Sequence, residues 1–228
     1  MLSKRLKMVA DMVEPCDFLA DIGTDHAYLP IYLYQQGIIK GAVAADISRG
    51  SCNKALRNIK AHRLDKYIEV RCGDGLGVLG ENEIPDTIVI AGMGGMLAIN
   101  VLKTHKSGVM TKRLVLQVQR DIYALRKHLH ATSYKIIDEK IIKEDNKVYT
   151  AMTAVKGQDV SYSEAEYHFG KILLSEKSPI LKEYITFEYN KIKKVLESLS
   201  AKEGEEINIR KNQLKNMLDI QKEALECL

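Results

Sequence analysis

Acidic and glycine residues stand close together near the N-terminus, in the segment Asp21-Ile22-Gly23-Thr24-Asp25-His26. Gly23 lets the backbone pass close to a ligand, because a side chain at that position would block the approach. The carboxylates of Asp21 and Asp25 would repel a pyrophosphate, and they suit a ligand with a positively charged group, such as the ammonium of a methionine moiety. This segment alone therefore predicts a cofactor whose nearest group is cationic.

Three later segments carry the same residue types. Asp46 follows Gly23 at about the spacing of 20 residues at which an acid meets ribose hydroxyls in nucleotide-binding folds. Gly73-Asp74-Gly75 offers a carboxylate that can accept from an adenine amino group, and Leu76 beside it offers an apolar contact for the ring. Ala91-Gly92-Met93-Gly94-Gly95 offers backbone groups and a Met side chain.

The elements that must position these segments follow from the hydrophobic pattern. Over the first 155 residues, short apolar runs alternate with helical patterns, which is typical of a parallel α/β sheet. Two longer runs, 135–142 and 148–155, with a charged turn between them, predict an antiparallel hairpin at the end of the sheet. Strands are expected at 18–22, 42–46, 67–71, 87–90 and 113–117, and helices at 28–36, 49–62, 96–103 and 122–129.

The acidic and glycine-rich segments therefore fall at the ends of successive strands. In an open parallel sheet, ligands bind outside the carboxyl ends of the strands, where the strand order reverses. Each residue alone also has a structural interpretation, Asp46 as a helix cap and Gly75 as a turn. Taken together, the segments predict S-adenosylmethionine as cofactor on a class I (Rossmann-like) methyltransferase sheet. The candidate cofactor-binding residues are Asp21, Gly23, Thr24, Asp25, His26, Asp46, Ile47, Asp74, Gly75, Leu76, Gly92 and Met93.

The sequence pattern indicates no general base for methyl transfer. The segment 91–95 stands where amino-methylating enzymes often carry an acid or Asn followed by prolines, and it contains neither. Met93 is also typical core filler, and a single His such as His26 is more often structural than catalytic. We leave the catalytic residue open, with His26, Tyr28 and Met93 as candidates.

The C-terminal part has a different pattern, which predicts continuous helix from about Ser163. Apolar residues there follow heptad spacings in two stretches, separated by the polar segment 200–206. We expect two antiparallel helices in a coiled-coil hairpin, and two domains, 1–158 and 159–228. The heptad positions are Leu181, Ile185, Ile192, Leu196 and Leu199, then Ile207, Leu214, Leu218 and Leu225.

Composition narrows the class of protein. With 46% hydrophobic and 28% charged residues, the chain has the composition of a globular protein. We expect a cytoplasmic protein, because the N-terminus does not resemble a signal peptide and no apolar run approaches the roughly 20 residues of a membrane span. The cysteines Cys16, Cys52, Cys72 and Cys227 form no CxxC pair, so we expect reduced thiols and no metal site.

Charge is distributed unevenly. Residues 1–155 hold 22 Lys and Arg against 17 Asp and Glu, whereas residues 156–228 hold 12 against 13. A polyanionic partner would find its positive charge on the first part, although many enzymes have a similar balance.

Several motifs, taken together, resemble the bacterial tRNA adenine-22 N1-methyltransferase family. They are DIGTDHAYLP (21–30), GDGL (73–76) and AGMGG (91–95), with the helical hairpin, LSKRLKMVADMV (2–13) and LVLQVQRDIYALRKHL (114–129). Two departures are visible: Gly50-Ser51 stands in place of Gly-Pro, and Gln117-Val118-Gln119-Arg120 in place of a Gln-Pro-Asn-like motif. The second removes any role for Pro or Asn there, while Gln117 is retained.

The resemblance implies transfer of a methyl group from S-adenosylmethionine to N1 of adenine 22 in tRNA. N1 faces the pairing partner of the base, so the adenine must be unstacked or flipped, with His26, Tyr28 and the Met93 segment as its walls. Lys4, Arg5, Lys7 and Gln117 are candidate RNA contacts. The helical hairpin is a second candidate, with self-association as its alternative role, and we expect a monomer or weak dimer.

Three other interpretations stay open. A methyltransferase of the same fold could act on another RNA or on a small molecule. A nicotinamide-dependent oxidoreductase is disfavoured, because 21–26 lacks the GxGxxG turn and carries two acids. A non-catalytic nucleic-acid-binding module would keep the pocket and work through its coiled coil.

Overall fold

A computed structural model describes residues 2–200 and 202–228 of the chain. By its internal contacts the chain divides into two compact units, Met1–Asp159 and Val160–Leu228. All of the predicted cofactor-binding residues lie in the first unit.

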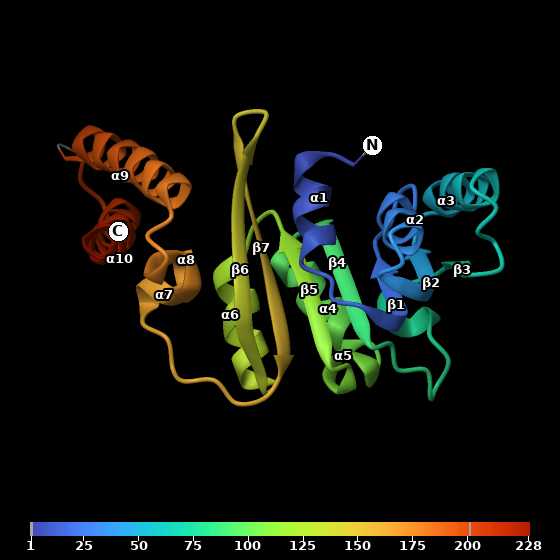
Figure 1. Ribbon diagram of the computed structural model, residues 1–228. Helices are drawn as coiled ribbons and strands as arrows, with labels where there is room; N and C mark the ends of the chain where they lie inside the picture. Colours follow the sequence, from blue (N-terminus) through green and yellow to red (C-terminus); the bar gives the residue numbers. More distant parts are fainter. Residues whose placement is uncertain (1, 201) are drawn as a thin grey trace. The chain divides into compact units, whose positions relative to one another are not determined.

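The first unit is built around a seven-stranded sheet with the order β3-β2-β1-β4-β5-β7-β6 (Figure 1). Strands β1 to β5 run parallel, and β7 pairs antiparallel with β5 and β6. The strand order reverses between β1 and β4, which confirms the predicted class I sheet with its closing hairpin. The strands are β1 Cys16–Ile22, β2 Ile39–Asp46, β3 Ile68–Cys72, β4 Thr87–Met93, β5 Arg113–Val118, β6 Tyr134–Glu144 and β7 Lys147–Lys156.

Helices cover both faces of this sheet. Parallel crossovers are right-handed, so α2 and α3, on the way out from β1 to β3, lie on one face, and α4, on the return from β4 to β5, lies on the other. Helix α1 packs against α2, and buried side chains of α1, α2 and α3 share one core cluster with the strands. The helices are α1 Lys4–Asp11, α2 Tyr28–Gln35, α3 Arg49–Ala61, η1 Gly75–Val78, α4 Gly95–Lys103, α5 Ser107–Met110 and α6 Ile122–Ala131.

Helix α1 was not expected from the hydrophobic pattern, and residues distant in sequence help to form it. The Ser3 side chain accepts a hydrogen bond from the amide of Leu6 at 3.2 Å. The carboxylate of Glu144, at the turn of the β6–β7 hairpin, accepts from the amides of Lys4 at 2.7 Å and Arg5 at 3.2 Å. A carboxylate is stabilising at a helix N-terminus, where amides lack partners. The sheet hairpin therefore fixes the start of α1.

The second unit is helical, as predicted, but the helical pattern expected to continue from about Ser163 to the polar segment 200–206 is interrupted twice. Gly170, with φ of +96°, separates two short helices, and Pro179 begins a new one. Helices α9 and α10 pack against each other, with Leu181, Ile185 and Leu214 buried among the heptad positions, which confirms the hairpin. The helices are α7 Glu164–Phe169, α8 Lys171–Ser175, α9 Pro179–Leu199 and α10 Glu205–Cys227.

In the described part of the chain, no helix is both long and apolar enough to cross a membrane.

Candidate functional site

Asp21 lies one residue before the end of β1, and its carboxyl group is buried. Its side chain is only 5% exposed, and this burial raises the pKa of Asp21 to about 6, an effect that the nearby charge of Asp46 reinforces. The Thr24 hydroxyl donates to the Asp21 carboxylate and opposes the shift. The same hydroxyl accepts from the amide of Ala27 at 3.0 Å. Thr24 therefore holds both the carboxylate and the turn that leads into α2.

The backbone after Asp21 turns tightly at Gly23. Gly23 has φ of +85°, and its amide and that of Thr24 both donate to the carbonyl of Ala45 at the end of β2, at 2.8 and 3.0 Å. A Cβ atom on Gly23 would lie 2.7 Å from Cε of Met93. A side chain at this position would therefore fill the space between the ends of β1 and β4, as the sequence predicts.

A cavity of about 250 Å³ lies at the carboxyl ends of β1, β2, β3 and β4, and we call it the inner cavity. It brings together most of the residues predicted to bind a cofactor. Two residues of α4, Leu97 and Val101, also line it, and the sequence analysis missed them. Their spacing of four on the helix after the 91–95 segment was the available signal. The lining residues are Ile22, Gly23, Ala45, Asp46, Ile47, Gly73, Asp74, Gly75, Ala91, Gly92, Met93, Leu97 and Val101.

The two carboxylates of the inner cavity differ in their surroundings. Asp46 Oδ1 accepts from the amide of Ser48 at 2.7 Å, which shapes the turn into α3. Within residues 2–200 and 202–228, Oδ2 of Asp46 has no hydrogen-bond partner. Asp74 precedes η1 without capping it, and its side chain is exposed. Both carboxylates are therefore available to hydroxyl or amino groups of a ligand.

The 91–95 segment forms a bulge at the end of β4. The pairing of β4 with β5 shifts register between Ala91 and Met93, where Gly92 has φ of +89°. A Cβ atom on Gly95 would lie 2.5 Å from the carbonyl oxygen of Asp121, so Gly95 allows this segment to pack directly on the loop after β5. Bulges of this kind are common beside functional sites because they redirect the backbone.

A second cavity of about 540 Å³, which we call the outer cavity, adjoins the first. The two share Gly23, Ala91 and Gly92. The rings of His26 and Tyr28 stack with centroids 4.9 Å apart and planes 4° from parallel, and Tyr28 is 50% exposed. The outer cavity is lined by Leu2, Ser3, Arg5, Leu6, Asp21, Gly23, Thr24, Asp25, His26, Tyr28, Leu29, Ala91 and Gly92.

Arg5 reaches the outer cavity from α1, and Gln117 positions it. Arg5 Nη1 donates to Oε1 of Gln117 at 2.6 Å, and Gln117 is fully buried on β5. The Arg5 guanidinium also lies 5.7 Å from the ring centroid of Tyr149 and 3.2 Å from where a Cβ atom on Gly92 would stand. The predicted RNA contacts Arg5 and Gln117 thus form one unit, in which only Arg5 faces the cavity.

Two of the predicted cofactor-binding residues, Asp25 and Leu76, serve the fold in the structure. Asp25 lines the outer cavity but is held by Lys54 and Ser51 of α3, each at 3.0 Å, and the hydrogen bond from Lys54 lowers its pKa. Leu76 is fully buried and does not line the inner cavity, so its side chain belongs to the core.

Lys7 forms an ion pair with Asp11 one turn along α1, and neither Lys4 nor Lys7 lines the outer cavity. Lys4 is exposed at the start of the helix. Of the three N-terminal cations chosen from the sequence, only Arg5 lies at the cavities.

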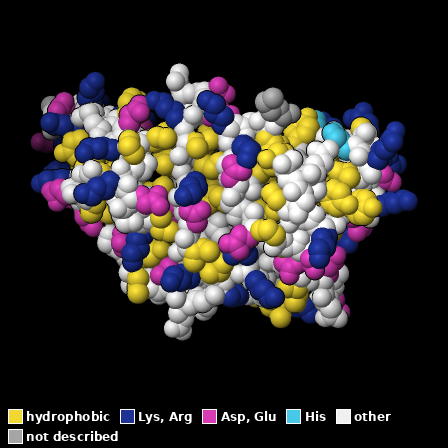
Figure 2. All heavy atoms as spheres, viewed as in Figure 1, with side chains coloured by type: hydrophobic (Ala, Val, Ile, Leu, Met, Phe, Trp, Pro, Cys, Tyr) yellow, Lys and Arg dark blue, Asp and Glu magenta, His cyan; other side chains and the backbone are white. Residues whose placement is uncertain are grey.

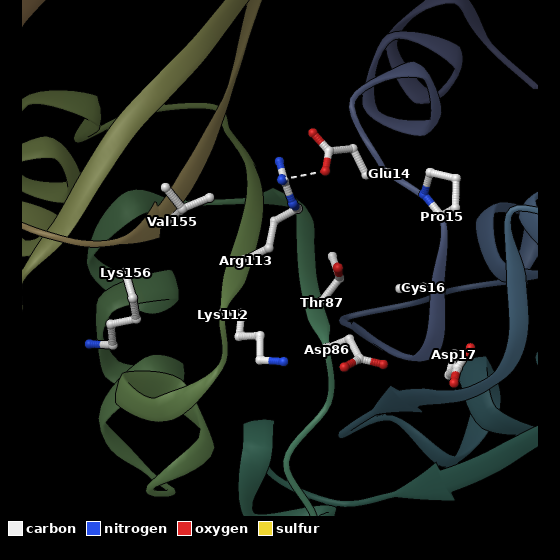
Figure 3. A pocket seen from close by; sticks show the side chains of 10 residues that line it. All are labelled: Glu14, Pro15, Cys16, Asp17, Asp86, Thr87, Lys112, Arg113, Val155 and Lys156. Carbon is white, nitrogen blue, oxygen red and sulfur yellow. Dashed lines mark hydrogen bonds and ion pairs between the residues drawn. The ribbon is translucent and has the colours of Figure 1, made fainter.

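A third cavity, of about 580 Å³, lies at the opposite, amino-terminal edge of the sheet, and we call it the opposite cavity (Figure 3). Arg113 at the start of β5 pairs there with Glu14. Asp86 accepts from the amide of Phe18 at 3.1 Å. Glu14, Arg113 and Asp86 therefore contribute to the fold. Among the residues that the structure describes, no three His, Cys, Asp or Glu side chains gather in a way that could hold a metal ion.

Comparison with known proteins agrees with this geometry. The sequence model of the tRNA (adenine(22)-N(1))-methyltransferase family matches residues 19–223. The tRNA (adenine(22)-N(1))-methyltransferase of Bacillus subtilis is 35% identical over 232 residues, covering 99% of this chain and 97% of that protein. The crystal structure of the B. subtilis M1A22 tRNA methyltransferase TrmK is 34% identical, with a TM-score of 0.91 and 99% of each chain covered. M. capricolum TrmK, solved with S-adenosyl-homocysteine, is 28% identical, with a TM-score of 0.90, covering 100% of this chain and 99% of that one.

Proposed function

Because this chain belongs to the tRNA (adenine(22)-N(1))-methyltransferase family, we propose that it transfers the methyl group of S-adenosylmethionine to N1 of adenine 22 in tRNA. The observation that carries the proposal is the junction of the inner and outer cavities at Gly23, Ala91 and Gly92. One cavity has the residues for a nucleoside cofactor, and the other has stacked aromatic walls for a base.

The inner cavity fits S-adenosylmethionine in its chemistry. The unpartnered Oδ2 of Asp46 suits ribose hydroxyls, and the exposed carboxylate of Asp74 suits an adenine amino group. Ile47, Leu97 and Val101 supply apolar contacts. The approach past Gly23 is open because glycine has no side chain. When bound there, S-adenosylmethionine supplies a methyl group on a positively charged sulfonium.

The outer cavity is the proposed site of the target adenine. The lone pair of N1 lies in the plane of the ring, so the main task of the protein is to hold that edge toward the inner cavity. The His26 and Tyr28 rings offer a flat surface for a flipped base, and Met93 stands at the boundary between the cavities. Arg5, held by Gln117, is within the same cavity to bind the adjoining phosphate.

In this proposal, the Asp21 carboxylate stabilises the positive charge of the reacting groups. N1 carries no proton in neutral adenine, so attack requires no general base, and the proposal gives His26, Tyr28 and Met93 positioning roles. Positive charge passes to the adenine ring during transfer. Asp21 is buried at the junction, and an ionised carboxylate there stabilises the positive charge on both sides of the reaction.

We further propose that the first unit carries the cofactor and the chemistry, and that the enzyme works in the cytoplasm, where its tRNA substrate is made. For the α9–α10 hairpin, contact with tRNA and self-association remain the two interpretations. Sedimentation of the protein with and without tRNA separates them, and a monomer or weak dimer is the expected state of the free protein.

The direct test is transfer of a labelled methyl group to an unmodified tRNA transcript, followed by nucleoside analysis. We expect 1-methyladenosine from a transcript with adenosine at position 22, and no label on a matched transcript with guanosine there. Label on another nucleoside, or equal label on both transcripts, would contradict the proposal.

A further inference from the structure

Helix α3 and the loop that follows it carry a high density of positive charge. Between residues 49 and 66 there are six Lys and Arg residues and a single acid, Asp65. Helix α3 buries Cys52, Ala55 and Ile59 against the sheet, and this spacing of three and four leaves the opposite side of the helix to solvent. The six cations, which we call the α3 surface, are Arg49, Lys54, Arg57, Lys60, Arg63 and Lys66.

All six side chains of the α3 surface are exposed, and Figure 2 shows Lys and Arg side chains over α3 at the right of the view. Lys54 alone forms an ion pair with an acid, Asp25, at 3.0 Å. The other five have no acidic partner in residues 2–200 and 202–228. Cations that no neighbouring acid neutralises keep their full attraction for an external anion.

The α3 surface is attached to the wall of the outer cavity by two contacts. Lys54 binds Asp25, and the Asn58 side chain donates to the carbonyl of His26 at 2.8 Å. Asp25 and His26 both line the outer cavity. A partner that places one group in the outer cavity therefore meets α3 directly beside it.

The neighbouring helix does not oppose this charge. Residues 28–37, which include α2, contain no charged residue, and α2 packs against α3 on the same face of the sheet. Exposed tyrosines stand on either side, Tyr28 at 50% and Tyr67 at 48% exposure. Cations interspersed with exposed aromatic rings are typical of surfaces that bind nucleic acids.

We propose that the α3 surface binds the phosphate backbone of the tRNA while the target adenine occupies the outer cavity. This inference rests on the proposed function, since the base in the cavity is what brings the backbone to α3. Successive cations on the helix lie about 5 Å apart along its axis, so neighbouring cations contact neighbouring phosphates. The N-terminal cations chosen from the sequence are less suited, because Lys7 is already paired with Asp11.

The test replaces three cations of the α3 surface that do not line either cavity, in the variant Arg57→Gln/Lys60→Gln/Arg63→Gln. We expect the KM for tRNA to rise about tenfold or more and the slope of log affinity against log salt to fall by about 2, since each neutralised phosphate contributes about 0.7–0.9. The kcat and the affinity for S-adenosylmethionine should change less than about twofold, because neither cavity is touched.

The matched control is Lys103→Gln/Lys106→Gln/Lys112→Gln, which removes the same charge from exposed side chains at the end of α4 and in the segment before β5. Affinity for tRNA is measured by direct titration as well as by methylation. Equal losses in both triple variants, or an unchanged KM in the first, would overturn the inference and leave the proposed function standing. Wild-type protein that fails to methylate tRNA contradicts the proposed function instead, and the titration still decides the surface. Weakened binding of polyglutamate with unchanged binding of tRNA would assign the surface to an acidic protein and overturn the inference.

Discussion

The two edges of one sheet carry cavities of similar size and opposite character. The opposite cavity, at the amino ends of the strands, is about 580 Å³, and the outer cavity at the carboxyl ends is about 540 Å³. At the amino edge, carboxylates are occupied by Arg113 and by the amide of Phe18. At the carboxyl edge, Asp46 Oδ2 has no hydrogen-bond partner in the described part of the chain, and three glycines, Gly23, Gly75 and Gly92, adopt positive φ. Available polar groups and close backbone approach, rather than volume, therefore mark the functional edge.

The largest effect is expected at Gly23. The change Gly23→Ala puts a methyl group where the backbone borders both the inner and the outer cavity. The flexible end of Met93, 2.7 Å from that methyl group, can move away, so the effect is expected on the ligand: affinity for S-adenosylmethionine should fall about 100-fold, or about 2.7 kcal/mol. Calorimetry measures the affinity. The control Gly37→Ala has a similar positive φ of +69° with nothing within 4 Å, so it should lose stability and bind cofactor normally. A wild-type affinity of Gly23→Ala for S-adenosylmethionine would contradict the conclusion that close backbone approach marks the carboxyl edge of the sheet as functional.

The next effect compares single carboxylates at the two edges. Asp46→Ala should weaken S-adenosylmethionine binding about 10- to 100-fold, as expected for hydrogen bonds to a charged group. Asp46→Asn keeps an acceptor for the Ser48 amide and separates the turn from the ligand contact. Asp17→Ala, beside the opposite cavity, should bind the cofactor like the wild type. If Asp17→Ala weakens S-adenosylmethionine binding as much as Asp46→Ala, the cofactor site is not specific to the carboxyl edge of the sheet.

The ionised Asp21 carboxylate is expected to lower the stability of the fold while it supports cofactor binding. Its pKa is raised to about 6 in the folded protein from 3.8, so the folded state holds the proton more tightly than the unfolded state. The free energy of unfolding therefore falls as pH rises from about 4 to about 6 and stays lower above that range. Asp21→Asn removes the buried charge, and we expect about 1–3 kcal/mol more stability at pH 7.5 together with weaker cofactor binding.

Denaturant unfolding at pH 4.5 and 7.5 measures the Asp21 effect, with the wild type losing stability between the two values and Asp21→Asn losing less. An Asn variant that is less stable than the wild type at pH 7.5 would show that the ionised carboxylate stabilises the fold.

The smallest effect is expected from a substitution at the amino edge of the sheet, in the Arg113–Glu14 ion pair. Arg113→Gln breaks the pair with Glu14, whose side chain is 63% exposed, and should lower the free energy of unfolding by less than about 1 kcal/mol. Methylation should be unchanged. A loss of methylation larger than the loss of folded protein would give the opposite cavity a functional role.

Much of the fold could be predicted from the sequence, because hydrophobic periodicity and the positions of glycines are local signals. The strand ends near Asp21, Asp46 and Asp74 were predictable, since each acid lies at or just after a run of residues typical of strands. The hairpin of α9 and α10 was predictable from its heptads. Helix α1 was missed although Ser3 is a local N-cap signal. The contribution of Glu144 to its N-terminus could not be predicted, because no local pattern links two residues so far apart.

Side-chain partners were the less predictable part of the site. Leu76 follows Asp74 in sequence, yet the 3₁₀ turn of η1 directs it into the core. Asp25 was expected to face a cationic ligand, and Lys54 of α3 holds it instead. Both outcomes depend on elements brought together by the fold. The α3 surface could not be predicted from the sequence for the same reason, since only the folded chain brings α3 beside the outer cavity.

The anchoring of Arg5 has a consequence for the order in which the site is completed during synthesis. Every residue lining the inner cavity has been made once the chain reaches Val101. The orientation of Arg5 waits for Gln117, and the start of α1 waits for Glu144. Contacts between such distant residues form late because the intervening chain must first be ordered. In the order of synthesis, every residue that lines the inner cavity thus precedes the residues that position Arg5 in the outer cavity.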